Sequence, residues 1–291
     1  MSRNATRASI LVFSTGSILA LVVACTTAQS TAAPEPGGPP TGDTKVRPAD
    51  GMTMVYVPGG EFTIGHRGSL QDRAHTVQLD SFWIDRTEVT NGRYGKCVAA
   101  GACSAPTMCS WGEPTYEDPL KADHPVICVP WRAAHAYCEW AGGRLPTEAE
   151  WEVAARGPDA MVYPWGHAFD GTRLNSCDAG CPHEDQRVTD YDDGYPQTGP
   201  VGSYPGGATW CGALDMAGNV WEWVADWYGR YPFAGQMNPS GPESGSERVI
   251  RGGSWYENNA YGFLRADHRH PFDPRAHNYL IGFRCVAAAE G

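Results

Sequence analysis

The stretch RLPTEAEWEVAARG, residues 144–157, carries the clearest local structural signal in the chain. Thr147 and Glu150 have the spacing of a capping box, in which each side chain satisfies a free backbone N–H group at the start of a helix. Good helix formers follow, and Gly157 is typical of a helix end. The sequence therefore predicts a helix that begins after Thr147 and ends at Gly157.

Two further helices are predicted on the N-terminal side of this stretch. The segment WRAAHAYCEWAGG, residues 131–143, is rich in alanine and closes with two glycines, which favours a helix that stops there. Thr90 is expected to cap a shorter helix that ends at Gly101. Beyond residue 157 regular periodicity is nearly lost, and turns, glycine, proline and aromatic residues dominate.

Strand signals lie closer to the N-terminus. Residues 54–65 alternate in polarity on either side of Pro58-Gly59-Gly60, which predicts a hairpin of two short strands. Residues 75–85, HTVQLDSFWID, are typical of a further strand. No internal repeat is visible. The elements predict an α+β fold with little regular secondary structure.

The composition agrees with a loop-rich domain. The 291 residues include 35 glycines, 23 prolines and 11 tryptophans, and 42% are hydrophobic, so aromatic side chains are expected to fill the core. The length allows one large or two small domains. The net charge of −11 disfavours nucleic acid and anionic lipid as partners and is compatible with hard cations such as calcium.

The N-terminus has the pattern of an export signal. Arg3 and Arg7 precede an apolar run over residues 10–24, which is short for a membrane span and ends in VVAC. Small residues followed by Cys25 resemble a bacterial lipobox, so residues 1–25 are expected to be a lipoprotein signal peptide with lipid attached to Cys25. The alternative is an ordinary signal peptide cut near Ala28.

A tether is expected between the lipid and the domain. Residues 26–50 are small, polar and rich in proline, which predicts a disordered linker before a domain over residues 51–287. The protein is then exported and lipid-anchored, on the outer-membrane, periplasmic or cell-surface side.

Ten cysteines in an exported chain imply disulfides. If Cys25 carries lipid, nine remain, and one is either free or paired outside the chain. Close spacing favours the pairs Cys97–Cys103 and Cys177–Cys181 as clips of loops. Spacing alone does not show how the remaining cysteines pair.

Eight strings in a fixed order carry a family resemblance, and they are GMTMVYVPGGEFTIG, DRTEVTNGRY, HPVICVPW, AYCEWAGGRLPTEAEWEVAARG, YPWG, GALDMAGNVWEWVADWY, RVIRGGSW and IGFRCV. Together they resemble the formylglycine-generating enzyme family, also called the sulfatase-modifying factor family, over about residues 51–287. The resemblance implies one domain with few long elements, distantly similar to C-type lectins. The family's activity oxidises a cysteine of a sulfatase to formylglycine with oxygen and a copper ion held by two cysteines.

The chain departs from the family at those two cysteines. Cu(I) is a soft ion that prefers thiolate ligands. After RGGSW the sequence places Glu257 and Gly262 at the two cysteine positions, and it has no cysteine between Cys211 and Cys285. A carboxylate and a glycine do not replace two thiolates, so the copper oxidase chemistry is not expected to carry over, because fold and function are separable.

The resemblance implies other features of this chain. Cys138 and Cys285 match a family disulfide, and a second family disulfide falls near Ala155 and Ala266, where both partners are lost. It also implies two structural calcium sites rich in oxygen ligands. The ligands implied at the first site are Asn175, Ser176, Asp193 and Tyr195, and those at the second are Asp215, Gly218, Asn219 and Glu222. From the residues alone these are ordinary turn and capping residues.

The old active-site region supplies a candidate pocket for a peptide, protein or glycan ligand, by analogy with the family groove. Its expected residues are Ser254, Trp255, Glu257, Tyr261 and Arg265.

Three other chemistries have candidate residues in or near this region. His268, His270 and His277 with Glu257 offer the donors of an iron or zinc site, or are simply loop histidines on a polar surface. Cys211 is either a lone nucleophile or a packed odd thiol. Ser254 has no evident histidine base beside it, which argues against a hydrolase.

Three functions follow from these observations. The first is a binding or scaffold lipoprotein, stabilised by calcium and without copper oxidase activity. The second is an oxidoreductase of altered chemistry on the same fold. The third, formylglycine generation on a sulfatase cysteine, conflicts with the missing thiols.

Overall fold

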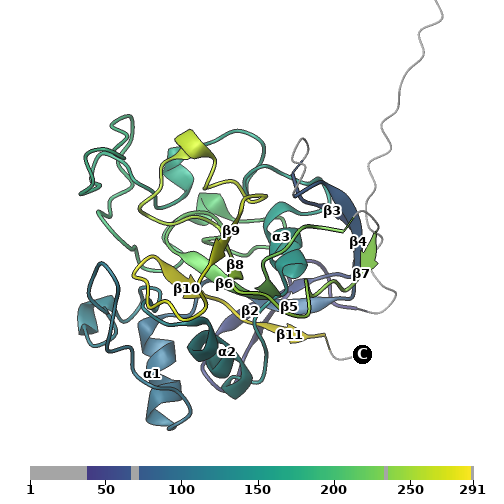
Figure 1. Ribbon diagram of the computed structural model, residues 1–291, viewed down its shortest axis with the longest axis horizontal. Helices are drawn as coiled ribbons and strands as arrows, with labels where there is room; N and C mark the ends of the chain where they lie inside the picture. Colours follow the sequence, from purple (N-terminus) through teal and green to yellow (C-terminus); the bar gives the residue numbers. More distant parts are fainter. Residues whose placement is uncertain (1–37, 67–71, 233–234, 290–291) are drawn as a thin grey trace, which may run out of the picture. The chain divides into compact units, whose positions relative to one another are not determined.

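A computed structural model describes residues 38–66, 72–232 and 235–289. These residues form three small β-sheets and three α-helices joined by long connections (Figure 1). The expected signal peptide with Cys25, and residues 26–37 of the expected linker, lie outside the described residues. Low secondary-structure content is confirmed as a property of the described fold.

The first sheet joins the start of the domain to its end. Its strands are β1 (Thr44–Val46), β2 (Thr53–Val57), β5 (Phe82–Asp85) and β11 (Val286–Ala288), in the order β1-β2-β5-β11 with antiparallel pairing. Since β1 lies within residues 26–50, the linker prediction is wrong for this part. Arg47 explains the order there, because its buried guanidinium pairs with Asp50 and Asp85.

The predicted hairpin around Pro58-Gly59 is also wrong. Strand β3 (Gly60–Ile64) pairs with β4 (His75–Leu79), which also pairs with β7 (Gln236–Met237), whereas β2 pairs with β5. A tight hairpin turn needs residues with positive φ, and neither Gly59 nor Gly60 has one. Gly59 instead packs against the backbone of residues 79–81. Pro58-Gly59 is thus a bend between β2 and β3, which pair in turn with β5 and β4.

The third sheet comes from the part of the chain in which the sequence showed little regularity. It contains β10 (Ile281–Phe283), β6 (Trp221–Trp227), β8 (Arg248–Arg251) and β9 (Arg269–Phe272), in that order. Five of the seven β6 residues are buried, the first four of them consecutively, because both faces of this strand are covered. The strand therefore has no period-two signature.

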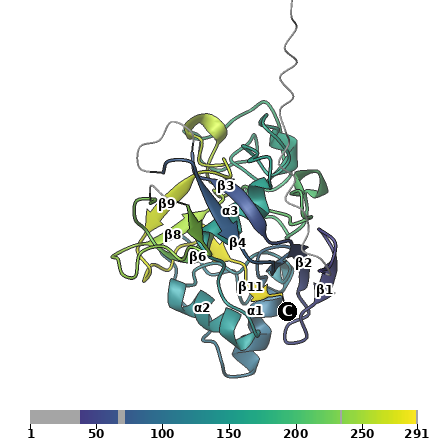
Figure 2. The same cartoon turned by 90° about the vertical axis from the view of Figure 1, so that its right-hand side faces the viewer.

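The three predicted helices are all present. They are α1 (Asn91–Ala99), α2 (Trp131–Trp140) and α3 (Glu148–Arg156). Thr147 caps α3 with both hydrogen bonds of the capping box, and Gly157 ends the helix with φ 65°. Helices α1 and α2 lie together at one side, and α3 packs between β3 and the β6–β8 pair (Figures 1 and 2). Short 3₁₀ turns cover Pro119–Lys121, Gly171–Arg173, Pro205–Gly207 and Asn259–Tyr261.

A buried ionic network surrounds α3. The guanidinium of Arg251 has no exposed surface and contacts both Glu148 and Glu152. Glu148 also pairs with Arg269, and Glu152 pairs with Arg156 one turn along the helix. The spacing of four residues places Glu148, Glu152 and Arg156 on one face of α3. This network fixes α3 against β8 and β9.

Four disulfides fasten the described chain. The three expected pairs, Cys97–Cys103, Cys138–Cys285 and Cys177–Cys181, are present, and Cys109–Cys128 is a further one. Cys211 is the free cysteine of the described residues and is buried in the core, where burial raises the pKa of its thiol. That environment is typical of a packed, inert thiol rather than a nucleophile.

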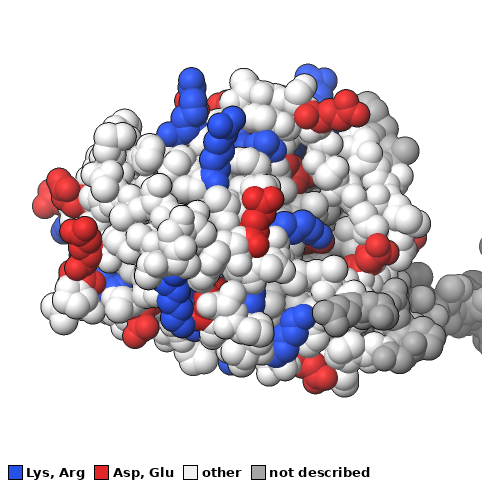
Figure 3. Space-filling view, turned by 90° about the horizontal axis from the view of Figure 1, so that it is seen from below, with Lys and Arg blue, Asp and Glu red and all other residues white. Residues whose placement is uncertain are grey.

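The surface mixes charges of both signs. One face shows Lys and Arg interspersed with Asp and Glu between wide areas of other residues (Figure 3). That face offers no continuous basic stripe of the kind that tracks a nucleic-acid backbone. Among the described helices, none has the length and apolar character required to cross a membrane.

Candidate functional site

Glu257 stands at the centre of the candidate site. Its Oε1 accepts a hydrogen bond from Trp221 Nε1 at 3.0 Å. Its Oε2 accepts bonds from the backbone N–H of Ser254 at 2.8 Å and from the Ser254 hydroxyl at 2.5 Å. Burial raises the pKa of Glu257, while these three donors act in the opposite direction. The carboxyl group is therefore held rigidly in one orientation.

Gly262, at the position expected from the sequence for the second family cysteine, has a special backbone conformation. It ends the 3₁₀ turn Asn259–Tyr261 in the left-handed region, with φ 73° and ψ 13°. Residues with a Cβ are strained there, and an added Cβ would lie 3.0 Å from Cδ of Arg265. The local backbone is thus built for glycine rather than for a second thiol.

A cavity of about 120 Å³ opens beside Glu257. Four rings line it: Trp221 from β6, His270 and Phe272 from β9, and Phe263 from the preceding loop. His270 and Phe272 share a face of β9 because they are two residues apart. We call this space the Glu257 cavity.

Aliphatic side chains complete the floor of the Glu257 cavity. They are Ile250, Leu280 and Ile281. Strand register explains their position, since Ile281 pairs with Trp221 and Ile250 pairs with His270. The third sheet therefore supplies most of the cavity wall.

The five expected pocket residues do not form one pocket. Ser254 and Trp255 are buried, and Ser254 acts by holding Glu257. Tyr261 is 71% exposed and lines a separate polar depression with Arg265. Arg265 pairs there with Asp267. Of the expected five, Glu257 alone lines the Glu257 cavity.

The histidines do not assemble a transition-metal site. His277 Nδ1 lies 3.2 Å from the backbone oxygen of Cys128, away from the cavity wall formed by His270. Burial lowers the pKa of His268 to about 4 and also lowers that of His270, so both rings are neutral at pH 7. The part of the chain that the structure describes contains no group of three or more His, Cys, Asp or Glu placed to hold a metal ion.

The first expected calcium set is brought together. Both Asp193 oxygens accept backbone hydrogen bonds, from Ser176 at 2.8 Å and from Tyr195 at 3.0 Å. Asn175 Oδ1 is buried and has no hydrogen-bond partner. Burial raises the pKa of Asp193 to about 6. An unpartnered amide oxygen beside a poorly neutralised carboxyl group fits an oxygen-preferring cation such as calcium.

The second expected set fits less well. Both Glu222 oxygens accept from Arg284, and Oε2 also accepts from Trp151. This carboxylate is therefore already neutralised. Asp215 keeps only one backbone donor, Gly202, beside a Glu88 whose buried Oε2 has no partner. Burial raises the pKa of Glu88, and the nearby carboxyl groups of Asp215 and Glu222 raise it further. Burial also raises the pKa of Asp215.

Gly218 and Asn219 connect the two sets. The Asn219 N–H donates to the backbone oxygen of Asn175 at 2.9 Å. A Cβ on Gly218 would lie 2.1 Å from that same oxygen, so only glycine fits. Asn219 Oδ1 accepts from Asn175 Nδ2 and from Gly199. These two residues act by fixing backbone positions rather than by offering free oxygens.

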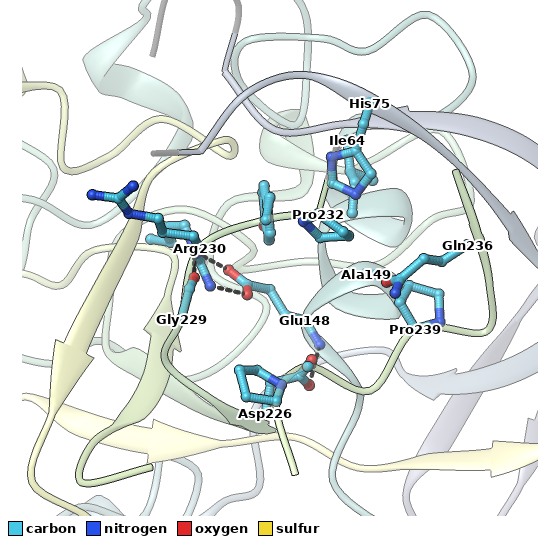
Figure 4. A pocket seen from close by; sticks show the side chains of 14 residues that line it. Ile64, His75, Glu148, Ala149, Asp226, Gly229, Arg230, Pro232, Gln236 and Pro239 are labelled. Atoms are coloured by element: carbon cyan, nitrogen blue, oxygen red, sulfur yellow. Dashed lines mark hydrogen bonds and ion pairs between the residues drawn. The ribbon is translucent and has the colours of Figure 1, made fainter. Parts of the chain in front are cut away.

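A second, larger cavity of about 230 Å³ lies at the start of α3. In Figure 4 the Asp226 carboxyl group approaches the backbone nitrogen of Glu148, whose N–H donates a hydrogen bond of 2.8 Å to Asp226 Oδ2. Burial and the neighbouring Glu148 raise the pKa of Asp226 to about 8. Pro232, Gln236 and Pro239 also line this space (Figure 4).

Several residues of these sites were not expected from the sequence. Phe263, Phe272 and Trp221 read as ordinary aromatic core residues, and no local pattern joins them to Glu257. Glu88 and Asp226 lie in strings that carry the family resemblance, but the string around Glu88, DRTEVTNGRY, gives no sign that its carboxyl group is buried. A carboxylate inside an otherwise apolar string, as in VWEWVADW, is the one signal that points to buried acid.

Comparisons with known proteins agree with this geometry. Residues 41–289 match the family model described as sulfatase-modifying factor enzyme 1-like domain. The chain is 34% identical over 310 residues to the formylglycine-generating enzyme of Streptomyces coelicolor, covering 89% of this chain and 96% of that enzyme. It is 33% identical to the hercynine oxygenase of Mycolicibacterium smegmatis, over 85% of this chain and 65% of the oxygenase.

The fold is shared with solved structures. PvdO from Pseudomonas aeruginosa superposes with a TM-score of 0.69 at 28% identity, covering 87% of this chain and all of PvdO. The chain therefore belongs to the family of sulfatase-modifying factor enzyme 1-like domains.

Proposed function

We propose that this protein is an exported, lipid-anchored binding or scaffold module that uses the Glu257 cavity as its ligand site and has no copper oxidase activity. Glu257 carries the proposal. Its carboxyl group is fixed by three hydrogen bonds from Trp221 and Ser254, and it offers Cu(I) no thiolate. The free Cys211 is buried among core residues and does not line the cavity.

Gly262 supports the same conclusion. Its left-handed backbone conformation suits glycine, and the residue offers Cu(I) no thiolate.

Calcium is proposed as a structural ion, held by Asn175 and Asp193 with backbone oxygens nearby. The unpartnered Asn175 Oδ1 supports this site. At the second site Asp215 and Glu88 are better candidates than Glu222, which is bound to Arg284. Export is supported by four disulfides, since such bonds persist in oxidising compartments.

An oxidoreductase of altered chemistry is the second candidate. It is favoured by the similarity to an enzyme named as an oxygenase. An oxidoreductase of this kind would need metal ligands from residues that the described structure does not bring together.

Metal content tests the proposal. The full chain, expressed with its export signal and purified with disulfides intact and without chelator, is expected to contain calcium and no stoichiometric copper, iron or zinc. Incubation with copper, oxygen and a peptide containing Cys-x-Pro-x-Arg is expected to yield no aldehyde. An Asp193→Asn variant should lose calcium, whereas an exposed Glu243→Gln variant should keep it. Stoichiometric transition metal, or aldehyde in the peptide, would refute the binding-module function.

A further inference from the structure

The rings of the Glu257 cavity stand at angles to one another rather than in a stack. The ring centroids of Trp221 and Phe263 are 6.3 Å apart with an interplanar angle of 65°. His270 lies 5.7 Å from Trp221 and 6.3 Å from Phe263, at angles of 38° and 83°. The His268 ring also packs 5.0 Å from Phe263 and 5.9 Å from Trp221. The rings therefore support one another by contact, and Trp221, Phe263 and His270 line the cavity with the surface that remains.

The carboxyl group of Glu257 lies at the edge of this aromatic enclosure. It is bound to Trp221 Nε1, so the carboxylate and the indole are joined in one unit. A donated N–H proton leaves more negative charge on the indole, and the face of an indole is already the aromatic surface that attracts cations best. The indole face of Trp221 and the carboxylate of Glu257 therefore both attract a positive charge.

Besides Glu257, the polar side chains that line the cavity are His270 and Asn278. His270 is neutral at pH 7 because burial lowers its pKa, and Asn278 Oδ1 accepts a hydrogen bond from the backbone N–H of Leu280. Two arginines close to His270 in sequence are paired with carboxylates, since Arg265 pairs with Asp267 and Arg269 pairs with Glu148. Ile250, Leu280 and Ile281 provide apolar surface that makes no hydrogen bond to a ligand. A strongly hydrated ion would lose its water there without replacement.

We propose that the Glu257 cavity binds an alkylated ammonium head group of a small molecule, with its positive charge against Trp221 and Glu257 and its methyl groups on the aliphatic floor. This assignment rests on the proposed binding function and names the ligand class. Aromatic cages use this chemistry to recognise quaternary ammonium groups. An engineered cavity of about 150 Å³ holds benzene, so 120 Å³ suits a nitrogen with three methyl groups and is too small for a hexose ring.

The charge itself can be tested with an isosteric pair of ligands. Choline and 3,3-dimethylbutan-1-ol have the same shape and differ in one atom, the positively charged nitrogen. Titration of the full chain by calorimetry, with tryptophan fluorescence as a second signal from Trp221, is expected to show choline binding at least tenfold more tightly than the alcohol. Equal binding of the two would overturn the proposal.

Substitutions of cavity residues test whether choline binds in the Glu257 cavity. Glu257→Gln keeps the size of the side chain and is expected to lower choline affinity at least tenfold while leaving binding of the alcohol unchanged. Phe272→Leu is expected to weaken choline several-fold and serves if Glu257→Gln fails to fold. The matched controls are Glu243→Gln on the surface and Phe169→Leu in a different aromatic cluster, and both should bind choline normally.

The outcomes separate this proposal from the proposed function. If the protein contains no transition metal and oxidises no thiol, but choline binds no better than the alcohol or binds Glu257→Gln equally well, only the ligand class is wrong. If a transition metal or thiol oxidation is found, the binding-module function fails, whatever choline does.

Discussion

Asp226 shows how the fold sets the charge of a single residue. Its side chain is buried at the start of α3, where it accepts one hydrogen bond from the Glu148 N–H. The carboxylates of Glu148 and Glu150 repel a negative charge there, and Arg269 only partly offsets them. The pKa of Asp226 rises to about 8, so the residue is neutral in the folded protein at pH 7.

This raised pKa predicts how stability depends on pH. In the unfolded chain Asp226 has a pKa near its ordinary value of 3.8. Between about pH 4 and pH 8 the folded state therefore binds a proton that the unfolded state has lost, and the contribution of Asp226 to stability falls as pH rises. Asp226→Asn removes this dependence, and its stability relative to wild type should grow by up to roughly 1.4 kcal/mol per pH unit.

Urea unfolding at pH 5, 6, 7 and 8 measures the effect. The difference between Asp226→Asn and wild type is expected to widen steadily with pH. Glu243→Gln, an exposed carboxyl group exchanged in the same way, should follow the wild-type profile. Parallel profiles for Asp226→Asn and wild type would mean that Asp226 is ionised in the folded protein.

Single residues also show what sequence can and cannot predict. The sequence predicts Glu257 and Gly262 at the positions of the family cysteine pair, because this prediction needs only the order and spacing of the family strings. The aromatic partners of Glu257 are not, since Trp221, Phe263 and Phe272 come together through strand register and a loop. No local pattern encodes that register.

At the scale of elements, helix α3 was predicted correctly because its signals are local. The capping box and the terminal Gly157 act within one turn of the helix. Strands β6, β8, β9 and β10 were missed because they are short or covered on both faces, so alternation does not appear. The hairpin prediction at Pro58-Gly59 is wrong because proline and glycine are typical both of a bend within a strand and of a hairpin turn.

The ionic network makes α3 sensitive to one arginine. Arg251 contacts Glu148, Glu152 and the backbone oxygen of Ala266 with no exposure to solvent. Arg251→Met leaves these oxygens buried with fewer donors, which typically costs about 3–5 kcal/mol. Thermal and urea unfolding should show this loss.

A surface pair is the control for the network. Arg275→Met removes an arginine that pairs with Asp273 in solvent, and it should leave the unfolding curve unchanged. If Arg251→Met were as stable as the control, the glutamates would be protonated or hydrated, and the network would not hold α3.

At the scale of the whole molecule, disulfide bonds hold together a chain that has little regular secondary structure. Three of the four disulfides were predicted, two from close spacing and Cys138–Cys285 from the family resemblance. The sequence does not predict Cys109–Cys128, because its partners have a sequence separation of 19 and spacing alone does not select such a pair.

The disulfides are not equivalent, because they close loops of very different length. Cys138–Cys285 spans 147 residues and ties α2 to the last strand, whereas Cys177–Cys181 spans four. The entropy of loop closure in the unfolded chain then predicts about 5 kcal/mol of stabilisation for the first link and about 2 kcal/mol for the second. Replacing each pair by alanine and measuring urea unfolding should give this order, with the long-loop variant losing more. Equal losses would show that the unfolded chain stays compact enough for the long link to restrict it no more than the short one.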